Sequence, residues 1–279
     1  MKNIKLVISY CLIFVASSCA QKSMTGSSFS NKTIVISALR VLCYNIHHAN
    51  PPSKPGIIDL EAIAKVIKQN NPDLVALQEV DVNTNRSGIT SNQAADLAKL
   101  SGLPYYFFAK AIDYGGGAYG VAILSKFPME EMKNTPLPTA DGTGGENRTL
   151  ATAIIKLPQG KKIVFANTHL DAQRSDTNRF LQINRVVEIL QHETLPVIIA
   201  GDFNATPSTR IINQLDQYFK RSCITSCGFT IPVNIPAKTI DFVAYKPFNF
   251  FKIKEHKVID EKYASDHLPV MAVLNLKEQ

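Results

Sequence analysis

Polar side chains stand at the ends of several apolar, strand-like runs in this 279-residue chain. In residues 197–204, four apolar residues lead directly into Gly-Asp-Phe-Asn. Burying an aspartate and an asparagine beside such a strand is costly unless a metal ion or a phosphate group uses them. Alone, this motif is typical of a turn with a polar tip. Four other segments share the design, however, and carry Asn45, Glu79, His169, and Asp266 with His267. We therefore expect these segments to converge on one polar site.

The oxygen donors of these segments favour a hard divalent cation. Glu79 is the only acid in residues 74–80, and taken alone it fits an edge carboxylate in solvent. Four further oxygen-bearing side chains accompany it: Asn45, Asp202, Asn204 and Asp266. Such a set without a Cys/His cluster is typical of Mg²⁺ or Mn²⁺, less of Ca²⁺ and least of Zn²⁺. The sequence therefore predicts a sparse carboxylate site for Mg²⁺, with Mn²⁺ as the alternative ion.

Two histidines add groups suited to proton transfer, because imidazole titrates near neutral pH. His169 lies in Asn-Thr-His and His267 in Ser-Asp-His. Asp241 is a lone acid among apolar strand residues, and contact with His267 would orient the ring and stabilise the imidazolium. Arg148 precedes another strand and is able to clamp phosphate oxygens, although a surface arginine is an equal interpretation. Two histidines converging with acids favour proton transfer over a structural role.

The elements that must position these residues are mostly hairpins, with a few helices between them. The apolar patterns predict strands at residues 38–45, 74–79, 105–109, 121–125, 150–157, 161–168, 240–245, 251–258 and 270–276. They predict helices after a cap at Asp59, over residues 93–100, and over residues 177–192. Hairpins interrupted by helices indicate an α+β sandwich rather than a parallel doubly wound sheet.

In this order and spacing, the motifs resemble the endonuclease/exonuclease/phosphatase superfamily, which includes deoxyribonuclease I. The motifs that carry the resemblance are Asn45, Gln78-Glu79, residues 119–125, Arg148, Thr168-His169, residues 201–204, residues 240–242 and residues 265–267. The resemblance covers residues 39–276. It implies a four-layer α/β/β/α sandwich, with a site at the top between two sheets.

The resemblance also implies how the oxygen donors are used. Glu79 would be the principal Mg²⁺ ligand, supported by Asn45 and Asp266. Asp202 and Asn204 would position or activate the attacking water. The expected reaction is therefore hydrolysis of a phosphate ester without a covalent enzyme intermediate.

Phosphate recognition is implied for a second group of residues. His267, paired with Asp241, would serve as general base or as phosphate clamp. His169 and Arg148 would stabilise the charge of the pentacoordinate phosphorane. Tyr119 matches a position that touches phosphate in some relatives, and packing is its alternative role. Arg86 lies in a loop beyond the metal glutamate and is a further candidate for substrate contact.

The amino terminus has the features of an export signal. Two lysines precede the apolar residues 6–15, which are too few to span a bilayer and suit a signal peptide. The following Ala-Ser-Ser-Cys resembles a bacterial lipobox in which Cys19 would be lipidated; ordinary cleavage after Ala20 is the alternative. We expect a signal peptide at 1–19, a tether at 20–33 and one domain at 34–279. The protein is then a periplasmic or outer-membrane lipoprotein, or is secreted.

Charge and cysteine content narrow the possible partners. The formal net charge of +7 favours anionic substrates, yet no block of Lys and Arg points to nucleic acid. Cys43, inside an apolar strand, is expected to be an inert core thiol. Cys223 and Cys227 are able to form a loop disulfide in an oxidising compartment, and are too few for a zinc site.

The leading interpretation is an exported, Mg²⁺-dependent phosphoesterase that acts as a monomer on a phosphate-ester substrate. A nuclease, a sphingomyelinase or phospholipase-type enzyme, a sugar or inositol phosphatase and a GPI-remodelling-like enzyme remain open within this class. The phenylalanines of residues 247–251 are a candidate membrane-entering hairpin, although core packing is their commoner role. A non-catalytic binding module on the same fold is the alternative from a different class.

Overall fold

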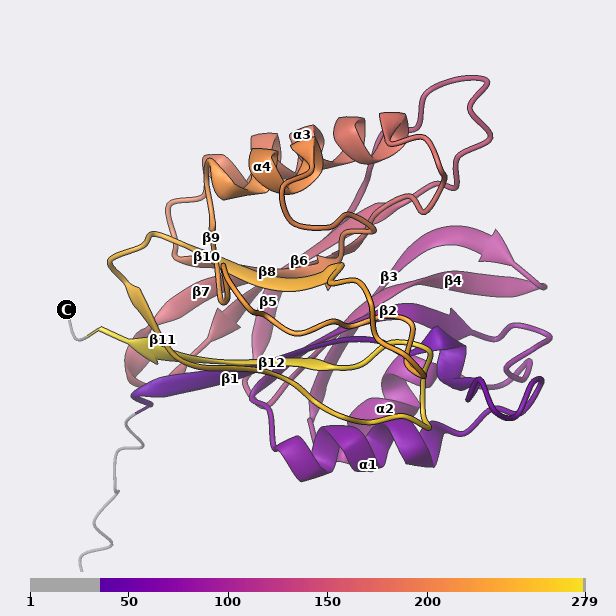
Figure 1. The fold of residues 1–279 in the computed structure, drawn as a ribbon. Helices are drawn as coiled ribbons and strands as arrows, with labels where there is room; N and C mark the ends of the chain where they lie inside the picture. The colour runs from indigo at the N-terminus through magenta and orange to yellow at the C-terminus, as the bar shows by residue number, and fades with distance from the viewer. Residues whose placement is uncertain (1–35, 278–279) are drawn as a thin grey trace, which may run out of the picture. The chain divides into compact units, whose positions relative to one another are not determined.

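The structure is a computed structural model that describes residues 36–277. Two six-stranded sheets pack face to face, and each has a pair of helices on its outer face (Figure 1). The helices are α1 (Leu60–Asn70), α2 (Gln93–Ser101), α3 (Thr177–Gln191) and α4 (Arg210–Asp216). This is the expected α+β, four-layer α/β/β/α sandwich. The predicted signal peptide, the tether and Cys19 lie outside the described residues.

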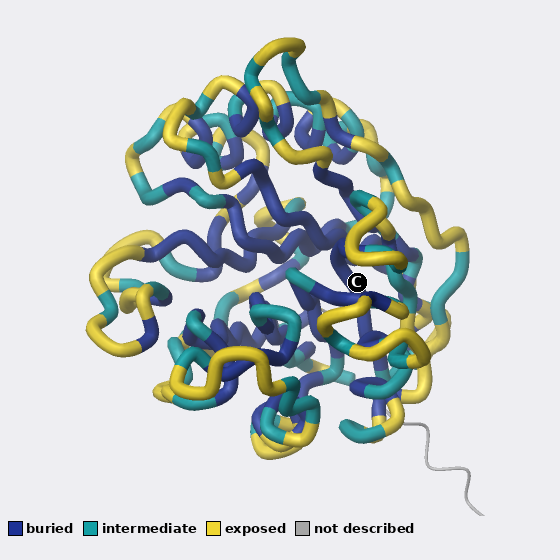
Figure 2. Tube along the Cα trace, turned by 90° about the vertical axis from the view of Figure 1, so that its right-hand side faces the viewer, coloured by how far each residue is buried: buried dark blue, intermediate teal, exposed yellow. Residues whose placement is uncertain are grey.

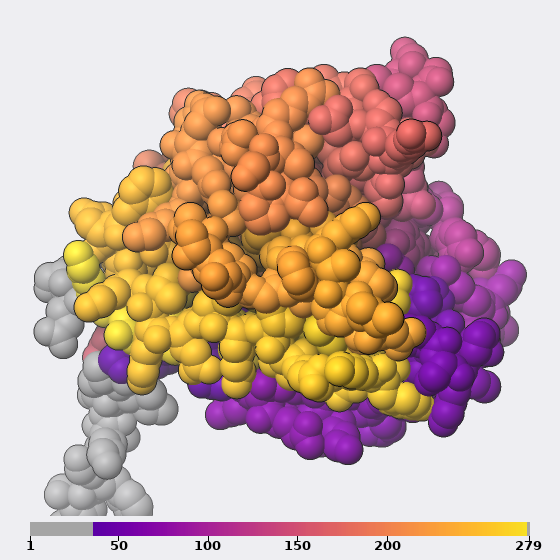
Figure 3. All heavy atoms as spheres, in the orientation of Figure 1, coloured from indigo at the N-terminus to yellow at the C-terminus, as the bar shows by residue number. Residues whose placement is uncertain are grey.

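The first sheet contains the amino-terminal strands, and the two carboxyl-terminal strands lie at one of its edges. Its strand order is β11 (Phe251–Val258), β12 (Val270–Leu276), β1 (Ala38–Asn45), β2 (Leu74–Val82), β4 (Gly117–Ser125) and β3 (Tyr105–Tyr114). β1 runs parallel to β2 and antiparallel to β12. Figure 3 shows these carboxyl-terminal residues, in yellow, over much of the face seen there. The chain just before β12 can therefore reach the end of β1.

The second sheet repeats this arrangement with the central residues of the chain. Its strand order is β5 (Met129–Pro136), β6 (Thr149–Lys156), β7 (Lys162–His169), β8 (Val197–Asp202), β10 (Asp241–Lys246) and β9 (Lys220–Arg221). β7 is parallel to β8, and β10 is antiparallel to β8. Each sheet thus has one central parallel pair whose carboxyl ends point to the same edge.

Alternating side chains of the strands fill two different layers of the core. In β1, Val41 and Cys43 pack between the sheets, whereas Leu42 and Tyr44 pack under α1 and α2. This follows from the period of two along a strand. Figure 2 shows the buried residues gathered in the strands and the exposed ones in the loops. Cys43 is fully buried, as expected of a core thiol, and burial raises its pKa.

Three elements were not anticipated from the sequence. β5 is an edge strand whose residues, Met-Glu-Glu-Met-Lys-Asn-Thr-Pro, are mostly exposed and lack apolar alternation. α4 has only seven residues, although Thr209 caps it, and β9 has two. Such short or edge elements are stabilised by neighbours rather than by their own pattern. Cys223 and Cys227, just after β9, form the disulfide that their spacing allowed.

A polar bridge links the two sheets in the middle of the apolar core. Gln78 of β2 donates from Nε2 to Oδ1 of Asn167 in β7, at 2.7 Å. The amide nitrogen of Asn167 donates to the carbonyl oxygens of Leu77 and Ala122, each at 2.8 Å. Both amide side chains are completely buried. Since a buried amide is stable only when its partners are present, this bridge fixes the register between the sheets.

We predict that Asn167→Ala lowers the free energy of unfolding by about 2–4 kcal/mol, because three buried polar groups lose their partner. Urea unfolding followed by circular dichroism measures this change. Asn213→Ala, at an exposed position of α4, is the matched control and should change stability by less than about 0.5 kcal/mol. A loss at Asn167 no larger than the control's would contradict the structural role of the bridge.

Candidate active site

The site lies where both sheets end at one edge of the sandwich. β1 and β2 run parallel, with Asn45 opposite Gln78, and β7 and β8 run parallel, with His169 opposite Asp202. The antiparallel β10 begins opposite Asp202 with its first residue, Asp241. The carboxyl ends of parallel strands and the amino ends of their antiparallel neighbours share an edge, so the polar residues converge as expected.

Asp202, Asp241 and His267 form a buried group in which one imidazole lies between two carboxylates. His267 Nδ1 is 3.0 Å from Oδ2 and 3.2 Å from Oδ1 of Asp241, and must donate because both oxygens are acceptors. His267 Nε2 is 3.7 Å from Oδ2 of Asp202. Burial opposes a charged ring, but Asp241 outweighs it and, with the charges of Asp202 and Asp266, raises the pKa of His267 to about 10.

The pKa of Asp202 is raised to about 7, first by burial and then by the negative charge of Asp241. The charge of His267 opposes this shift. The three residues therefore share protons as a unit. In the absence of a metal ion, the unit keeps a positive imidazolium beside carboxyl groups at neutral pH.

Asn45 connects this group to Glu79. Its amide nitrogen donates to Oε1 of Glu79 at 3.1 Å and to Oδ2 of Asp202 at 3.0 Å. Its amide oxygen accepts from the backbone N–H of His47 at 3.1 Å. The nitrogen therefore faces the two acids, and direct coordination of a metal by Asn45 would require the amide to turn over.

Glu79 is the extra residue of a β-bulge, because Gln78 pairs with Val121 while Val80 pairs with Gly120. Its φ of 57° is a left-handed conformation that is unfavourable for a non-glycine residue and is found at functional sites. Burial would raise the pKa of Glu79, but the neighbouring imidazole of His48, the hydrogen bond from Asn45 and the charge of His169 outweigh it. The net effect lowers the pKa well below its ordinary value, so the carboxylate is ionised.

His169, Arg148 and Tyr119 lie beside these acids. His169 Nε2 is 3.4 Å from Oδ2 of Asp202, and burial and the charge of Arg148 lower the pKa of its ring. Arg148 is 7% exposed, contacts Tyr119, and places Nη2 at 3.3 Å from Glu146. Both His169 Nδ1 and Arg148 Nε are buried without a hydrogen-bond partner. Arg148 Nε is a donor without a partner and indicates a place for an anionic ligand.

Asn204 and Asp266 lie at the rim of this cluster. The backbone N–H of Asn204 donates to Oδ1 of Asp202 at 2.9 Å, and its side chain donates to the carbonyl of Leu170. Asp266 precedes His267 in the chain and acts on it by charge. The neighbouring Ser265 donates to the carbonyl oxygen of Asn45 at 2.7 Å, which ties this segment to β1.

Arg86 is paired with an aspartate outside this cluster. Its Nε and Nη2 donate to the two oxygens of the buried Asp81, at 2.7 and 2.9 Å. Its guanidinium carbon lies 4.2 Å from the centre of the Tyr114 ring. Arg86 therefore fastens the loop after β2 to the β3–β4 hairpin, and the expectation of substrate contact gains no support.

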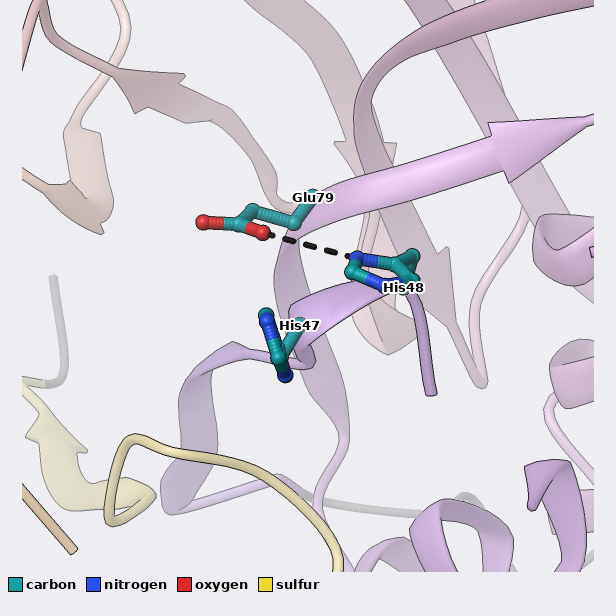
Figure 4. A group of neighbouring side chains, drawn as sticks. All are labelled: His47, His48 and Glu79. Carbon is teal, nitrogen blue, oxygen red and sulfur yellow. Dashed lines mark ion pairs between the residues drawn. The ribbon is translucent and has the colours of Figure 1, made fainter. Parts of the chain in front are cut away.

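Two histidines next to Glu79 were not proposed as site residues from the sequence. His47 and His48 follow Asn45 after one residue, Ile46, and face the Glu79 carboxylate, with His48 Nδ1 at 3.8 Å from Oε2 (Figure 4). The signal was present, since adjacent histidines come one residue after a strand ending in a polar side chain. The prediction of the metal assumed that the site has no cluster of histidines. This assumption is wrong, because two histidines lie beside Glu79 in the structure.

The residues present fit a divalent cation. Two separate groups of side chains each bring three potential ligand atoms within 4.8 Å of one another. One group is His47, His48 and Glu79, and the other is Asp202, Asp241 and His267. The second group is buried, and its carboxylates repel each other unless a proton or another cation compensates. The site can therefore hold a cation and an anion side by side, which is the requirement for a metal-bound phosphate ester.

Comparisons with known proteins bear on the family and the fold. The Endonuclease/Exonuclease/phosphatase family model matches residues 42–267. Among solved structures, an endonuclease/exonuclease/phosphatase from Beutenbergia cavernae has a TM-score of 0.75 at 26% identity, over 86% of this chain and 72% of that chain. A mannosyl-6-phosphatase from Bacteroides thetaiotaomicron has a TM-score of 0.67 at 19% identity, over 85% and 99%.

A truncated TDP2 from Caenorhabditis elegans has a TM-score of 0.63 at 22% identity, over 85% of this chain and 98% of that chain. Likeness at this level of identity, as for the mannosyl-6-phosphatase, shows a common fold. No curated protein matches the sequence.

We predict that the free energy of unfolding of the metal-free protein falls as the pH rises from 7 to 8.5, by about 1 kcal/mol per pH unit. An unfolded histidine loses its proton near pH 6.5, whereas folded His267 keeps it until about pH 10. The folded state therefore binds more protons in this window, and raising the pH destabilises it. Urea unfolding in EDTA measures the slope, and Asp241→Asn should remove at least half of it. An equal slope in that variant would contradict the assignment.

Proposed function

The chain belongs to the endonuclease/exonuclease/phosphatase family, and on this basis we propose that it is a Mg²⁺- or Mn²⁺-dependent phosphoesterase. The observation that carries the proposal is the hydrogen-bonded connection from Glu79 through Asn45 to Asp202, which places ionised and proton-sharing carboxylates in one buried site. Next to it lie buried nitrogen atoms of His169 and Arg148 that have no hydrogen-bond partner. The reaction proposed is in-line attack of water on a phosphate ester.

Phosphate binding falls to Arg148, His169 and Tyr119. Arg148 has an unpaired Nε in a buried position, and its guanidinium group is suited to bind phosphate oxygens. His169 Nδ1 is equally unpaired, and the Tyr119 hydroxyl contacts Arg148. Preorganised donors of this kind stabilise the negative charge that grows on the phosphoryl oxygens in the transition state.

The attacking water is assigned to Asp202 and Asn204. With a pKa of about 7, the Asp202 carboxyl exchanges a proton near neutral pH, which suits a general base. His267 keeps its proton on Nε2, next to Asp202, because Asp241 stabilises the imidazolium. Of the two roles expected for His267, these contacts favour the phosphate clamp over the base.

Glu79 and Asp266 are the residues assigned to hold the metal, with Asn45 orienting Glu79. Mg²⁺ or Mn²⁺, when bound there, supplies Lewis-acid polarisation of a phosphoryl oxygen and stabilisation of the leaving alkoxide. The low pKa of Glu79 supports this assignment, because an ionised carboxylate is the form that coordinates a cation. Water exclusion comes from the surrounding strands, since Asp202, Asp241 and His267 are each at most 4% exposed.

The structure gives little support to a membrane-entering hairpin at residues 247–251. Phe251 is buried and packs on Tyr245, and Phe250 packs on Phe251, so only Phe248 is largely exposed. β10 begins at Asp241 in the site, and its six residues carry the chain about 17 Å away before this turn. We therefore favour a small phosphate ester as substrate over a lipid headgroup in a bilayer.

The protein of residues 21–279 should hydrolyse bis-p-nitrophenyl phosphate or p-nitrophenyl phosphate in the presence of Mg²⁺. Glu79→Ala and His267→Ala should each lower kcat/KM by at least about 10³, because each removes a charge from the reaction centre. Glu255→Gln, at an exposed position of β11, is the matched control. The preferred ester separates a diesterase from a monoesterase. Absence of both turnover and Glu79-dependent Mg²⁺ binding would favour a non-catalytic binding module.

We also propose that the chain is exported and anchored through a lipidated Cys19, and that it acts as a monomer. The support is the lipobox-like sequence and the Cys223–Cys227 disulfide, which fits an oxidising compartment. No helix among residues 36–277 is long and apolar enough to cross a membrane. Labelled fatty acid should enter the wild type in a bacterial host and be absent from Cys19→Ser. Equal labelling, or none in either protein, would contradict the anchor.

A further inference from the structure

We propose that His47, His48 and Glu79 form a second, nitrogen-rich metal site, distinct from the oxygen-rich group around Asp202. It would bind a transition-metal dication of the Zn²⁺ class. This inference goes beyond the proposed function, since it does not require the chain to hydrolyse any ester. Figure 4 shows the group: one imidazole nitrogen of His48 points to a Glu79 oxygen, and the other Glu79 oxygen points away from both rings.

The separation of the ligand atoms suits a common ion. One ring nitrogen from each histidine and one Glu79 oxygen lie within 4.8 Å of one another. In a tetrahedral site, two ligands about 2.1 Å from the same ion stand about 3.4 Å apart. The side chains therefore need to approach by at most about 1.4 Å, which rotamer changes of these partly exposed residues supply.

The hydrogen bond of His47 leaves its other nitrogen free for coordination. His47 Nδ1 is 2.8 Å from the backbone carbonyl oxygen of Asn50. A carbonyl oxygen only accepts, so Nδ1 carries the proton and Nε2 retains its lone pair. Metal-binding histidines are commonly oriented by such a bond from their second ring nitrogen to a carbonyl. His47 thus has the tautomer of a ligand before any metal arrives.

His48 has a buried ring nitrogen that no other group satisfies. Its Nδ1 is buried and has no hydrogen-bond partner, and it faces Glu79 Oε2 at a distance of 3.8 Å. A buried polar atom without a partner is rare in proteins and calls for an explanation such as an ion. A metal ion between His48 and Glu79 would satisfy both atoms.

The backbone of this turn is strained and rigidly held. His47, His48 and Ala49 have φ values of 47°, 43° and 60°, three consecutive non-glycine residues in the left-handed region. Each costs about 1–2 kcal/mol, and such strain is typical of functional sites. The buried Gln93 donates to the His48 carbonyl at 2.7 Å, and Asp59 donates its N–H to the Ala49 carbonyl. These bonds hold both imidazoles towards Glu79.

The two carboxylate oxygens of Glu79 serve different neighbours. Oε1 accepts from Asn45, which also contacts Asp202, whereas Oε2 faces His48. Glu79 therefore faces the Asn45 amide on one side, with Asp202 beyond it, and His48 on the other. Two imidazoles and one carboxylate are the ligand set of many Zn²⁺ and Fe²⁺ centres and are unusual for Mg²⁺.

Co²⁺, a spectroscopic substitute for Zn²⁺, tests the proposal in the metal-free full-length protein without any phosphate ester. We expect visible absorption and paramagnetically shifted, exchangeable imidazole N–H signals in the NMR spectrum. His48→Gln should weaken Co²⁺ binding at least tenfold, and His47→Gln should remove one N–H signal. His256→Gln is the matched control, because its ring contacts Ser222 and Cys227 instead. Circular dichroism verifies the fold of each variant.

Asp202→Asn separates this site from the neighbouring oxygen-rich group. We expect it to leave the shifted imidazole signals in place. Co²⁺ affinity within twofold of wild type in both His48→Gln and His47→Gln would overturn the proposal. Loss of the imidazole signals in Asp202→Asn would overturn it as well, because one shared centre would then explain the binding. Failure of the hydrolase assay leaves these binding results unaffected, so the two proposals fail independently.

Discussion

The buried amide bridge between Gln78 and Asn167 is the interaction on which the site depends. It crosses from one sheet to the other inside an apolar core, and both amides find their partners only when the sheets hold one register. Glu79 follows Gln78 directly, and His169 lies two residues beyond Asn167. A slip between the sheets would therefore separate Glu79 from His169 and Asp202. Two apolar sheet faces alone could slide along each other. The bridge permits only one register and so fixes the positions of the polar groups.

The site next to this bridge holds several charged side chains that are buried away from water. Asp202 and Asp241 are almost fully buried, and they are tolerated because His267 and the amide of Asn45 lie between or beside them. The same surroundings raise the pKa of Asp202 and His267 and lower that of Glu79. The two carboxyl groups therefore differ in pKa: that of Glu79 stays ionised, whereas that of Asp202 exchanges its proton near pH 7. This difference is what acid–base work on a metal-bound phosphate requires.

Neighbouring residues of the same type have different roles according to their partners. Arg86 is occupied by both oxygens of Asp81 and fastens a loop, whereas Arg148 keeps an unpaired nitrogen in the site. Among the histidines, His256 is satisfied by Ser222 and Cys227, while His48 and His169 each retain a buried nitrogen without a partner. Buried nitrogen atoms without a partner, rather than residue types, therefore mark where this molecule is prepared for a ligand.

The sequence by itself determined the strands, the longer helices and the convergence of the polar strand ends. Alternation in residues 38–45 and the cap at Asp59 are local patterns that the structure reproduces. It also determined that Asn45, Glu79, His169, Asp202, Asp241 and His267 belong together, because strand ends of one sheet edge must meet. Only the tertiary structure decided that Arg86 serves Asp81, that the Asn45 nitrogen faces the acids, and that His47 and His48 flank Glu79. It also decided that residues 129–136 form the edge strand β5. These features depend on side-chain orientation, a bulge and left-handed turns, whose energies come from partners distant in the chain.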